Sequence, residues 1–376
     1  MVSLLALLLG APPLRLEPRV QEPPATPLDG PGAFLYEEPG TIHDFEITLT
    51  DEAASLLGRG EPDVHATLGY RGVRLDVGLK LKGSSTFRGI DGKPSFKIDI
   101  GQWVDKQTLL GVRRLTLNNM ITDPTMMREH AAYRLYEDVG VPAPRHAYAR
   151  VKVNGEPYGL YGIVESMDER FLRRQFPGDS EGNLYDTHYT YADLTSSGVA
   201  YYALKEGHPL VPGEDLRDLV SELGSGNILD VIDKRFDRDA LLGMWAVEFA
   251  SSNWDSYVRN TNNYLLYHAT GSDRWHFLPW GQDSAFRGGG SVYQGVVGRM
   301  ATACLGDTQC KSLLDARVRS VVDTWEDGDL LGYMQETWAL IGPECEDDQR
   351  KEAGCDPQAI LSILADRPAS VREDLP

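Results

Sequence analysis

The chain has 376 residues, which is enough for a large hydrophobic core and is a typical length for two domains or two lobes. It carries 37 Lys and Arg residues against 56 Asp and Glu residues, and the resulting net charge of −19 argues against a surface that binds nucleic acid or an anionic membrane. With 41% hydrophobic and 25% charged residues, the composition is that of an ordinary globular protein.

The N-terminal sequence MVSLLALLLGA is an apolar run of signal-peptide length, too short to cross a bilayer as a helix. It lacks a preceding basic region, which indicates a clipped or mis-started export signal, and a buried first strand is the alternative interpretation. Residues 12–40 are rich in Pro, Gly and Glu, which predicts an extended linker. We therefore expect an exported protein, extracellular or in the cell envelope, with no transmembrane span and with its folded part beginning near residue 41.

The folded part is predicted to open with strands. Residues 44–50 alternate between apolar and polar side chains, as in a half-buried strand, and a short helix is expected at 51–57. Strands at 64–70 and 73–82 flank an Arg-Gly turn, and a further strand is expected at 94–100.

A basic, hydroxyl-rich loop, KGSSTFRG, separates the last two of these strands. Its Ser84 and Ser85 lie in a stretch whose backbone N–H groups suit a phosphate, and Lys82, Arg88 or Lys97 can supply positive charge. The loop matches neither a Walker P-loop nor G-x-G-x-x-G, and a solvated hairpin turn is the alternative.

A strand at 115–119 precedes a helix that is predicted to start at Asp123, with Asp123 as its cap, and to run to about Asp138. Arg128 and Glu129 are its side chains available for a role outside the core. Strands at 146–154 and 157–164 then form a hairpin around Asn-Gly, followed by a helix at 169–176. Strands, one helix, a hairpin and another helix follow one another in the order of a kinase small lobe and hinge.

The stretch from Asn253 to Asp283 predicts a second hairpin, with strands at 264–268 and 275–278. Antiparallel strands return to their own start, so the loops before and after this hairpin should meet at its open end. Asp255 and Asn263 are therefore expected beside Asp283, in a site suited to a divalent metal and phosphate.

The protein-kinase active centre has a comparable order: a catalytic Asp, an Asn a few residues later, a short hairpin and a metal-binding Asp. Asp255 occupies the catalytic position and Asp283 the metal position. Asn260 has the usual spacing from Asp255, whereas Asn263 immediately precedes the strand; we prefer Asn263 and keep Asn260 as the alternative. Asp and Asn are also frequent in turns that have no catalytic role.

Four cysteines lie in the last quarter of the chain. Their spacings do not fit the C-x-x-C pairs of a structural zinc site, and an even number in an exported protein favours two local disulfides. The expected pairs are Cys304–Cys310 and Cys345–Cys355, and unpaired cytosolic thiols are the alternative.

The remaining sequence is predicted to be mainly helical. We expect helices near 215–223, 240–250, 311–325, 330–341 and 357–365. The predicted organisation is thus an export-like start and linker (1–40), a small lobe with hinge (41–176), and a large lobe (177–376) that carries the 253–283 hairpin and the cysteine-containing helical tail.

Four segments together resemble the CotH family of spore-coat-type proteins, whose members are similar to atypical protein kinases. They are KGSSTFR with PSFKIDI, LNNMITDPTMMREHAAYRLYEDVGVPAPR, VKVNGEPYGLYGIVESMDERFL, and NWDSYVRNTNNYLLYH with FLPWGQDSAF. They cover roughly residues 41–300 in the family order.

The resemblance implies an α+β, kinase-like, two-lobed fold, with an antiparallel sheet in the small lobe and a larger, mainly helical lobe. It implies transfer of the ATP γ-phosphate, with Mg²⁺ or Mn²⁺, to Ser/Thr of exported or coat proteins. Asp255 would be the catalytic acid, Asp283 and Asn263 metal ligands, Lys97 the strand lysine at the phosphates, and Glu129 its helix partner. Lys82 and Arg88 would face the phosphates.

One position departs from the family. Members often have W-D-x-D where this chain has Trp280-Gly281-Gln282-Asp283. A kinase-like binding module without activity, such as a pseudokinase or a surface ligand, is therefore the second hypothesis. A metal-dependent phosphohydrolase or nuclease is the third, and it lacks the additional carboxylates that two-metal sites usually need. The sequence does not identify the protein substrate or the oligomeric state.

Overall fold

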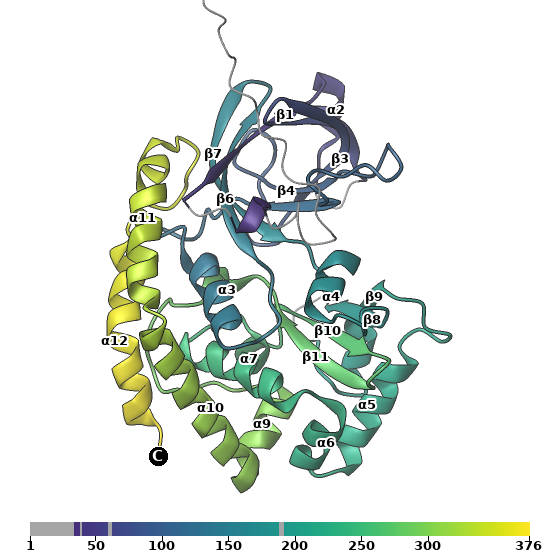
Figure 1. Ribbon diagram of the computed structural model, residues 1–376, viewed down its shortest axis with the longest axis vertical. Coiled ribbons are helices and arrows are strands. Elements are labelled where there is room, and N and C mark those ends of the chain that lie inside the picture. The colour runs from purple at the N-terminus through teal and green to yellow at the C-terminus, as the bar shows by residue number, and fades with distance from the viewer. Residues whose placement is uncertain (1–33, 38–39, 59–61, 188–191) are drawn as a thin grey trace, which may run out of the picture.

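The computed structural model describes residues 34–37, 40–58, 62–187 and 192–376. The apolar N-terminal run and most of the predicted linker lie outside these residues. The described chain is an α+β protein in which a β-barrel sits above a mainly helical part that contains a second sheet (Figure 1). Among the described residues, no helix combines the length and hydropathy needed to cross a bilayer.

Seven strands form the barrel: β1 (Ile42–Thr48), β2 (Val64–Tyr70), β3 (Val73–Lys82), β4 (Ser95–Asp99), β5 (Arg114–Asn118), β6 (His146–Val153) and β7 (Glu156–Glu165). Their order is β1-β2-β3-β4-β5-β7-β6, and β1 pairs with β6 in parallel to close the ring. All other neighbours are antiparallel. The predicted antiparallel sheet is therefore corrected to a mixed, closed barrel, because the edge of β1 that does not face β2 pairs with β6 in parallel.

Alternating apolar side chains fill the interior of the barrel. Phe45 and Ile47 of β1, Leu79 of β3, Phe96 of β4 and Ile163 of β7 are all buried there. Since side chains alternate between the two faces of a strand, this alternation places the opposite face of β1 and β2 toward solvent.

Two helices are associated with the barrel strands. Helix α2 (Asp51–Leu56) begins after Thr50, whose side chain accepts a hydrogen bond from the N–H of Ala53. Helix α3 (Arg128–Asp138) lies between the barrel and the helical part (Figure 1).

The predicted start of α3 at Asp123 is wrong by several residues. The cap position is Met127, and Met126 before it has a left-handed φ of 53°, which interrupts the helix. Asp123 still acts as an acceptor here, because its carboxylate binds the N–H of Thr125 and that of Arg128, the first residue of α3.

The helical part contains a four-stranded sheet in the order β11-β10-β8-β9. Its strands are β8 (Asn183–Thr187), β9 (Tyr202–Glu206), β10 (Tyr264–Ala269) and β11 (Arg274–Pro279). The helices before and beside it are α4 (Glu169–Gln175), α5 (Glu214–Ser225), α6 (Ile228–Arg235), α7 (Arg238–Ala250) and α8 (Tyr257–Asn260). Every residue of α7 from Leu241 to Ala250 is buried, which explains why that stretch of sequence is apolar on all sides apart from Glu248.

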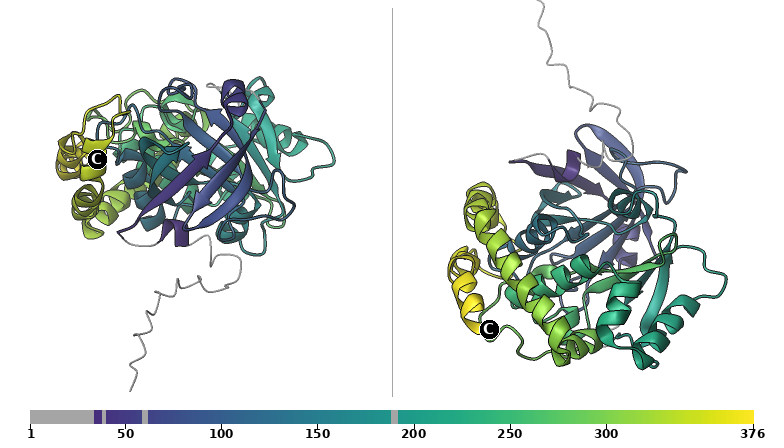
Figure 2. Two further views of the ribbon diagram at one scale, coloured as in Figure 1. Left: turned by 90° about the horizontal axis from the view of Figure 1, so that it is seen from above. Right: turned by 60° about the horizontal axis from the view of Figure 1, so that its bottom comes forward.

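Four further helices complete the chain: α9 (Arg299–Gly306), α10 (Thr308–Asp327), α11 (Leu330–Asp347) and α12 (Gln358–Asp374). Helix α10 packs on α7, and α11 runs up alongside the barrel next to β7 (Figures 1 and 2). Both predicted disulfides are present: Cys304–Cys310 joins α9 to α10, and Cys345–Cys355 joins the end of α11 to the segment before α12.

Candidate functional site

The β10–β11 hairpin brings its two flanking loops together, as the sequence predicts. Tyr264 pairs with Pro279 at the open end, and the N–H of Trp280 donates to the carbonyl oxygen of Asn263 over 3.0 Å. Both Asn263 and Gly281 have left-handed backbones, with φ of 55° and 57°, so the two loops turn sharply on leaving the strands. This places Asp255 and Asp283 on the two sides of one junction.

Three asparagine amides hold the carboxylate of Asp255. Asn260 and Asn262 donate to its Oδ1 over 2.6 and 2.9 Å, and Asn263 donates to its Oδ2 over 2.9 Å. A carboxylate accepts hydrogen bonds only, so these contacts orient each NH₂ group toward Asp255 and each amide oxygen away from it. The sequence analysis did not predict the contact of Asn262 with Asp255, because nothing in the sequence distinguishes Asn262 from Asn260 and Asn263.

The loop that carries Asp255 rests on a buried acid. The carboxylate Oε2 of Glu248, in α7, accepts the N–H of Val258, and its main-chain carbonyl accepts the N–H of Asn253. Burial raises the pKa of Glu248 from 4.5 to about 8. In the sequence, Glu248 is one polar residue in an apolar helix, and nothing there distinguished it as a support for this loop.

Asn253 and Gln282 connect the two loops directly. The Nδ2 of Asn253 donates to Oε1 of Gln282 over 2.9 Å, and the Oδ1 of Asn253 accepts the N–H of Asp255. The hydroxyl of Tyr136, on α3, donates to the same oxygen of Gln282. Gln282, which separates Gly281 from Asp283, is therefore fully buried and structural.

Asp283 has free coordination capacity. Among the described residues, its carboxylate accepts one hydrogen bond, from Thr122 over 3.4 Å. Burial raises its pKa, Asp123 and Asp255 raise it further, and the nearby Arg287 and Lys82 oppose them. Asp255 is thus close enough to Asp283 for the two charges to interact.

The oxygen atoms available at this junction are of the type that hard divalent cations bind. A Cβ on Gly281 would lie 2.7 Å from the Oδ1 of Asn263, which accepts no hydrogen bond from the described residues, and Asp283 follows Gly281 by two residues in the sequence. No group of three or more His, Cys, Asp and Glu side chains in the described part of the chain converges to hold a metal. A cation here would therefore depend on one carboxylate, amide oxygen and ligand phosphate, a set that suits Mg²⁺.

A second group of residues faces this junction from the barrel and α3. Lys82, at the end of β3, donates to Oδ1 of Asn118 over 2.5 Å, and Nδ2 of Asn118 donates to Glu129 over 2.7 Å. Burial lowers the pKa of Lys82 to about 8 and raises the pKa of Glu129 to about 7. The charge of Asp283 acts to raise both pKa values, so Asp283 lies near both side chains. Asn118 thus joins the lysine and the acid into one chain of contacts.

Lys97 does not take the place expected of it beside Glu129. Its neighbouring charges are Asp186, Lys80, Arg114 and Asp63, and it makes no hydrogen bond or ion pair with Glu129 in the described part of the chain. The partner of Glu129 through Asn118 is Lys82, because β3 ends next to α3 whereas Lys97 lies in the middle of β4.

Lys97 instead lines a cavity of about 360 Å³ between the barrel and the second sheet. Lys205 of β9 and Trp280 line it too, and both were missed from the sequence. Lys82 and Lys205 lie 5.6 and 5.9 Å from the centre of the Trp280 ring, so Trp280 connects the cavity to the Lys82–Glu129 contacts. The segment Ser166–Asp168, after β7, forms part of the cavity wall.

The predicted phosphate loop after Lys82 has two different parts. Ser84 and Ser85 are exposed at its tip, near Gly83, which has a left-handed φ of 120°. Arg88 is bound through two nitrogens to Glu352, far along the chain, so its charge is already paired. The expectation that Arg88 faces the phosphates is therefore not supported by its contacts.

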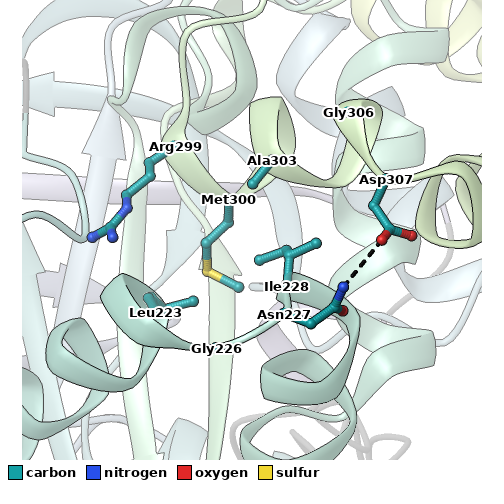
Figure 3. A pocket seen from close by; sticks show the side chains of 9 residues that line it. All are labelled: Leu223, Gly226, Asn227, Ile228, Arg299, Met300, Ala303, Gly306 and Asp307. Atoms are coloured by element: carbon teal, nitrogen blue, oxygen red, sulfur yellow. Dashed lines mark hydrogen bonds between the residues drawn. The ribbon is translucent and has the colours of Figure 1, made fainter.

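Another cavity, of about 400 Å³, lies between the α5–α6 junction and α9 (Figure 3). Asn227 donates to Asp307 over 3.2 Å at its edge. It contains none of the predicted site residues, and its walls belong to the helical part alone.

Comparison with known proteins gives the same family as the sequence segments. The family described as CotH kinase protein matches residues 79–359. The chain is 26% identical over 227 residues to the inner spore coat protein H of Bacillus subtilis, covering 57% of this chain and 59% of the relative. It is also 43% identical over 56 residues to an inner spore coat protein H-like protein of that organism, covering 15% of this chain and 18% of that one.

The chain thus spans about three fifths of the length of the first of these relatives. Among solved structures, the Helicobacter pylori proinflammatory kinase CtkA aligns with 85% of this chain and 92% of its own, at 8% identity and a TM-score of 0.33. That likeness is too weak to bear on fold or function. The family match covers most of the chain, and the protein belongs to the CotH family.

Proposed function

We propose that this protein is a metal-dependent protein kinase that transfers the γ-phosphate of ATP to Ser or Thr hydroxyls of exported or surface proteins. In this proposal the barrel and α3 are the small lobe of a kinase-like arrangement, and the helical part with the second sheet is the large lobe. The observation that carries it is the junction where Asp255 and Asp283 face the Lys82–Asn118–Glu129 contacts.

Each residue at the junction would have a separate role in the transfer of phosphate. Bound Mg²⁺ or Mn²⁺ would neutralise charge on the nucleotide phosphates, held by Asp283 and by the amide oxygen of Asn263. Lys82 would provide positive charge to the phosphates, oriented by Asn118. Asp255, fixed by its three amide donors, would orient the acceptor hydroxyl and take its proton.

The cavity lined by Lys97, Lys205 and Trp280 would hold the nucleotide. Its walls include Leu115 and Leu265, which suit the faces of a planar base, whereas the lysines suit phosphate. Asn260 remains an alternative ligand for the metal. The likeness to inner spore coat proteins and the two disulfides support export or a coat location.

One observation favours a binding module without activity. Gly281 stands where family members often have the first Asp of W-D-x-D, so one carboxylate is missing from the junction. The kinase proposal therefore requires that Asp283 alone among the carboxylates of that motif binds the metal.

The test is nucleotide-induced thermal stabilisation together with phosphate transfer from labelled ATP to a Ser-rich peptide, both with Mg²⁺ or Mn²⁺. We expect Asp283→Ala to lose both signals, and Asp255→Ala to keep the thermal shift while its turnover falls by about 10² or more. Asp218→Ala, an exposed position on α5, is the matched control and should behave like the wild type. If wild type and Asp283→Ala behave alike in both assays, the binding module replaces the kinase.

A further inference from the structure

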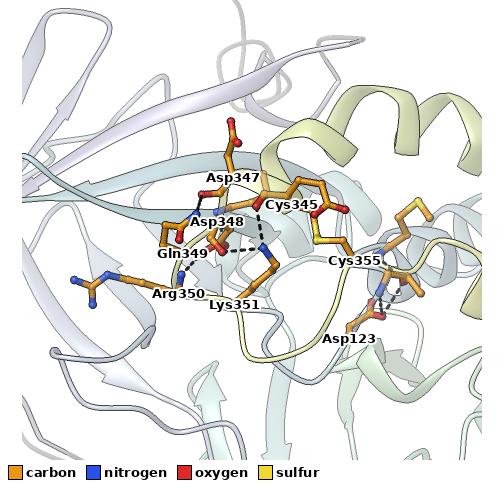
Figure 4. Close-up of a disulfide and its surroundings, with 12 residues drawn as sticks. Asp123, Cys345, Asp347, Asp348, Gln349, Arg350, Lys351 and Cys355 are labelled. Atoms are coloured by element: carbon orange, nitrogen blue, oxygen red, sulfur yellow. Dashed lines mark hydrogen bonds between the residues drawn. A yellow bond between two sulfur atoms is a disulfide. The ribbon is translucent and has the colours of Figure 1, made fainter.

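The disulfide loop, residues 345–355, begins in the last turns of the helix α11 but makes its contacts on the barrel. Cys345–Cys355 closes it, and Figure 4 shows Asp347, Asp348, Gln349, Arg350 and Lys351 between the two cysteines. Several of its side chains meet residues 86–93, which belong to the long loop between β3 and β4. That loop follows directly on Lys82.

The main contact is a buried ion pair. Lys93 donates to Asp348 over 2.6 Å and to the carbonyl oxygen of Leu160 over 2.7 Å, and both charged side chains are fully buried. Asp348 also accepts the N–H of Leu160. The carboxylate of Asp348 occupies the space that a side chain at position 159 would fill, since a Cβ on Gly159 would lie 2.1 Å from the Cγ of Asp348.

Two further side chains extend the contact along the same barrel loop. The guanidinium of Arg350 stacks on the Tyr158 ring at 3.9 Å and donates to the carbonyl oxygens of Asp91 and Gly92. Glu352 forms the paired contact with Arg88. The disulfide loop therefore binds residues 86–93 near both ends.

Asn119 and its neighbour Asn118 connect the barrel loop to the candidate site. Asn119 donates to the carbonyl oxygens of Thr86 and Lys93, and its neighbour Asn118 links Lys82 to Glu129. On the other side, the N–H of Asp356, just past the disulfide, donates to the carbonyl oxygen of Pro124, shortly before α3. The same segment thus touches the barrel loop and the turn that precedes the helix bearing Glu129.

We propose that the Cys345–Cys355 loop is a positioning element of the nucleotide site: it holds residues 83–94 and the start of α3 so that Lys82 and Glu129 meet across Asn118. The inference rests on the proposed function for its consequence in nucleotide binding. Arg350 and Asp348 are then positioning residues, which act through the barrel loop without touching the nucleotide.

The experiment compares two double variants of the full chain. Cys345→Ser/Cys355→Ser opens the disulfide loop, and Cys304→Ser/Cys310→Ser, the matched control, opens the disulfide between α9 and α10. We expect faster amide hydrogen exchange in residues 83–94 for the first variant only. We also expect its KM for ATP to rise by about tenfold with little change in kcat, because supporting contacts around a site typically contribute that much.

Arg350→Ala is the second test, because it keeps the disulfide and the buried pair. It should speed exchange in residues 89–92 and raise the KM for ATP in the same direction. Unchanged exchange in 83–94 on opening Cys345–Cys355, or an equal rise in KM in the control, would overturn the positioning role while leaving the kinase proposal standing. A wild type without any nucleotide-induced thermal shift would refute the proposed function, and the inference with it.

Discussion

Replacing Glu248 by Gln should make the protein more stable at alkaline pH. Glu248 is completely buried in α7, its Oε1 has no hydrogen-bond partner among the described residues, and burial raises its pKa from 4.5 to about 8. In the unfolded chain the acid ionises near its ordinary pKa, so the folded state binds one more proton between these two values. Stability is therefore lost as pH rises from about 4.5 to 8.

The magnitude follows from that difference in pKa. At about 1.4 kcal/mol per pKa unit, a rise from 4.5 to about 8 corresponds to about 5 kcal/mol of stability that is present below pH 4.5 and absent above pH 8. Gln keeps an oxygen that can accept the N–H of Val258, and its NH₂ replaces the acid O–H in the same place. The variant should match the wild type near pH 4.5 and exceed it by about 3–5 kcal/mol at pH 9.

Urea unfolding of both proteins at pH 5, 7 and 9 measures this difference. Glu181→Gln, at an exposed position before β8, is the control and should shift none of the three midpoints relative to the wild type. If Glu248→Gln is no more stable than the wild type at pH 9, burial does not raise the pKa of Glu248 in the folded protein.

Three other variants test separate features. Gly281→Asp should lower Tm, rather than restore a family feature, because φ is 57° there and a Cβ would lie 2.7 Å from Oδ1 of Asn263; differential scanning fluorimetry measures this. Lys93→Met should cost about 3–5 kcal/mol in urea unfolding, since it leaves the carboxylate of Asp348 buried without its partner. Burial lowers the pKa of His130 from 6.5 to about 4, so the wild type should lose about 3 kcal/mol as pH falls through that range, and His130→Asn should lose less.

Local patterns in the sequence predicted most of the strands and the β10–β11 hairpin. The bounds 64–70 and 73–82 are confirmed by β2 and β3, because alternation and turn residues are local signals. The position of Asp255 beside Asp283 follows from hairpin topology alone. Strands β8 and β9 were not predicted, since they lie in a polar stretch and form by pairing with distant or neighbouring strands: β8 pairs with β10, and β9 pairs with β8.

The features that the sequence did not predict are interactions between distant segments. The contact of Lys82 with Asn118, which binds Glu129, was not predicted because the sequence does not show which strand ends next to α3. The ion pair between Arg88 and Glu352 was not predicted either. The two residues are 264 positions apart, and no local pattern indicates their pairing. Closure of the barrel by a parallel pair likewise depends on the path of the whole chain.

That closure has a consequence for how the protein can be shortened. Strand β1 is the first strand among the residues that the structure describes, and it pairs with the edges of both β2 and β6. A fragment that starts after residue 50 would retain the family-matched region, 79–359, and would expose two unpaired strand edges with their free N–H and C=O groups. Such edges pair readily with other chains, so domain boundaries drawn from family similarity alone would yield a fragment prone to aggregation.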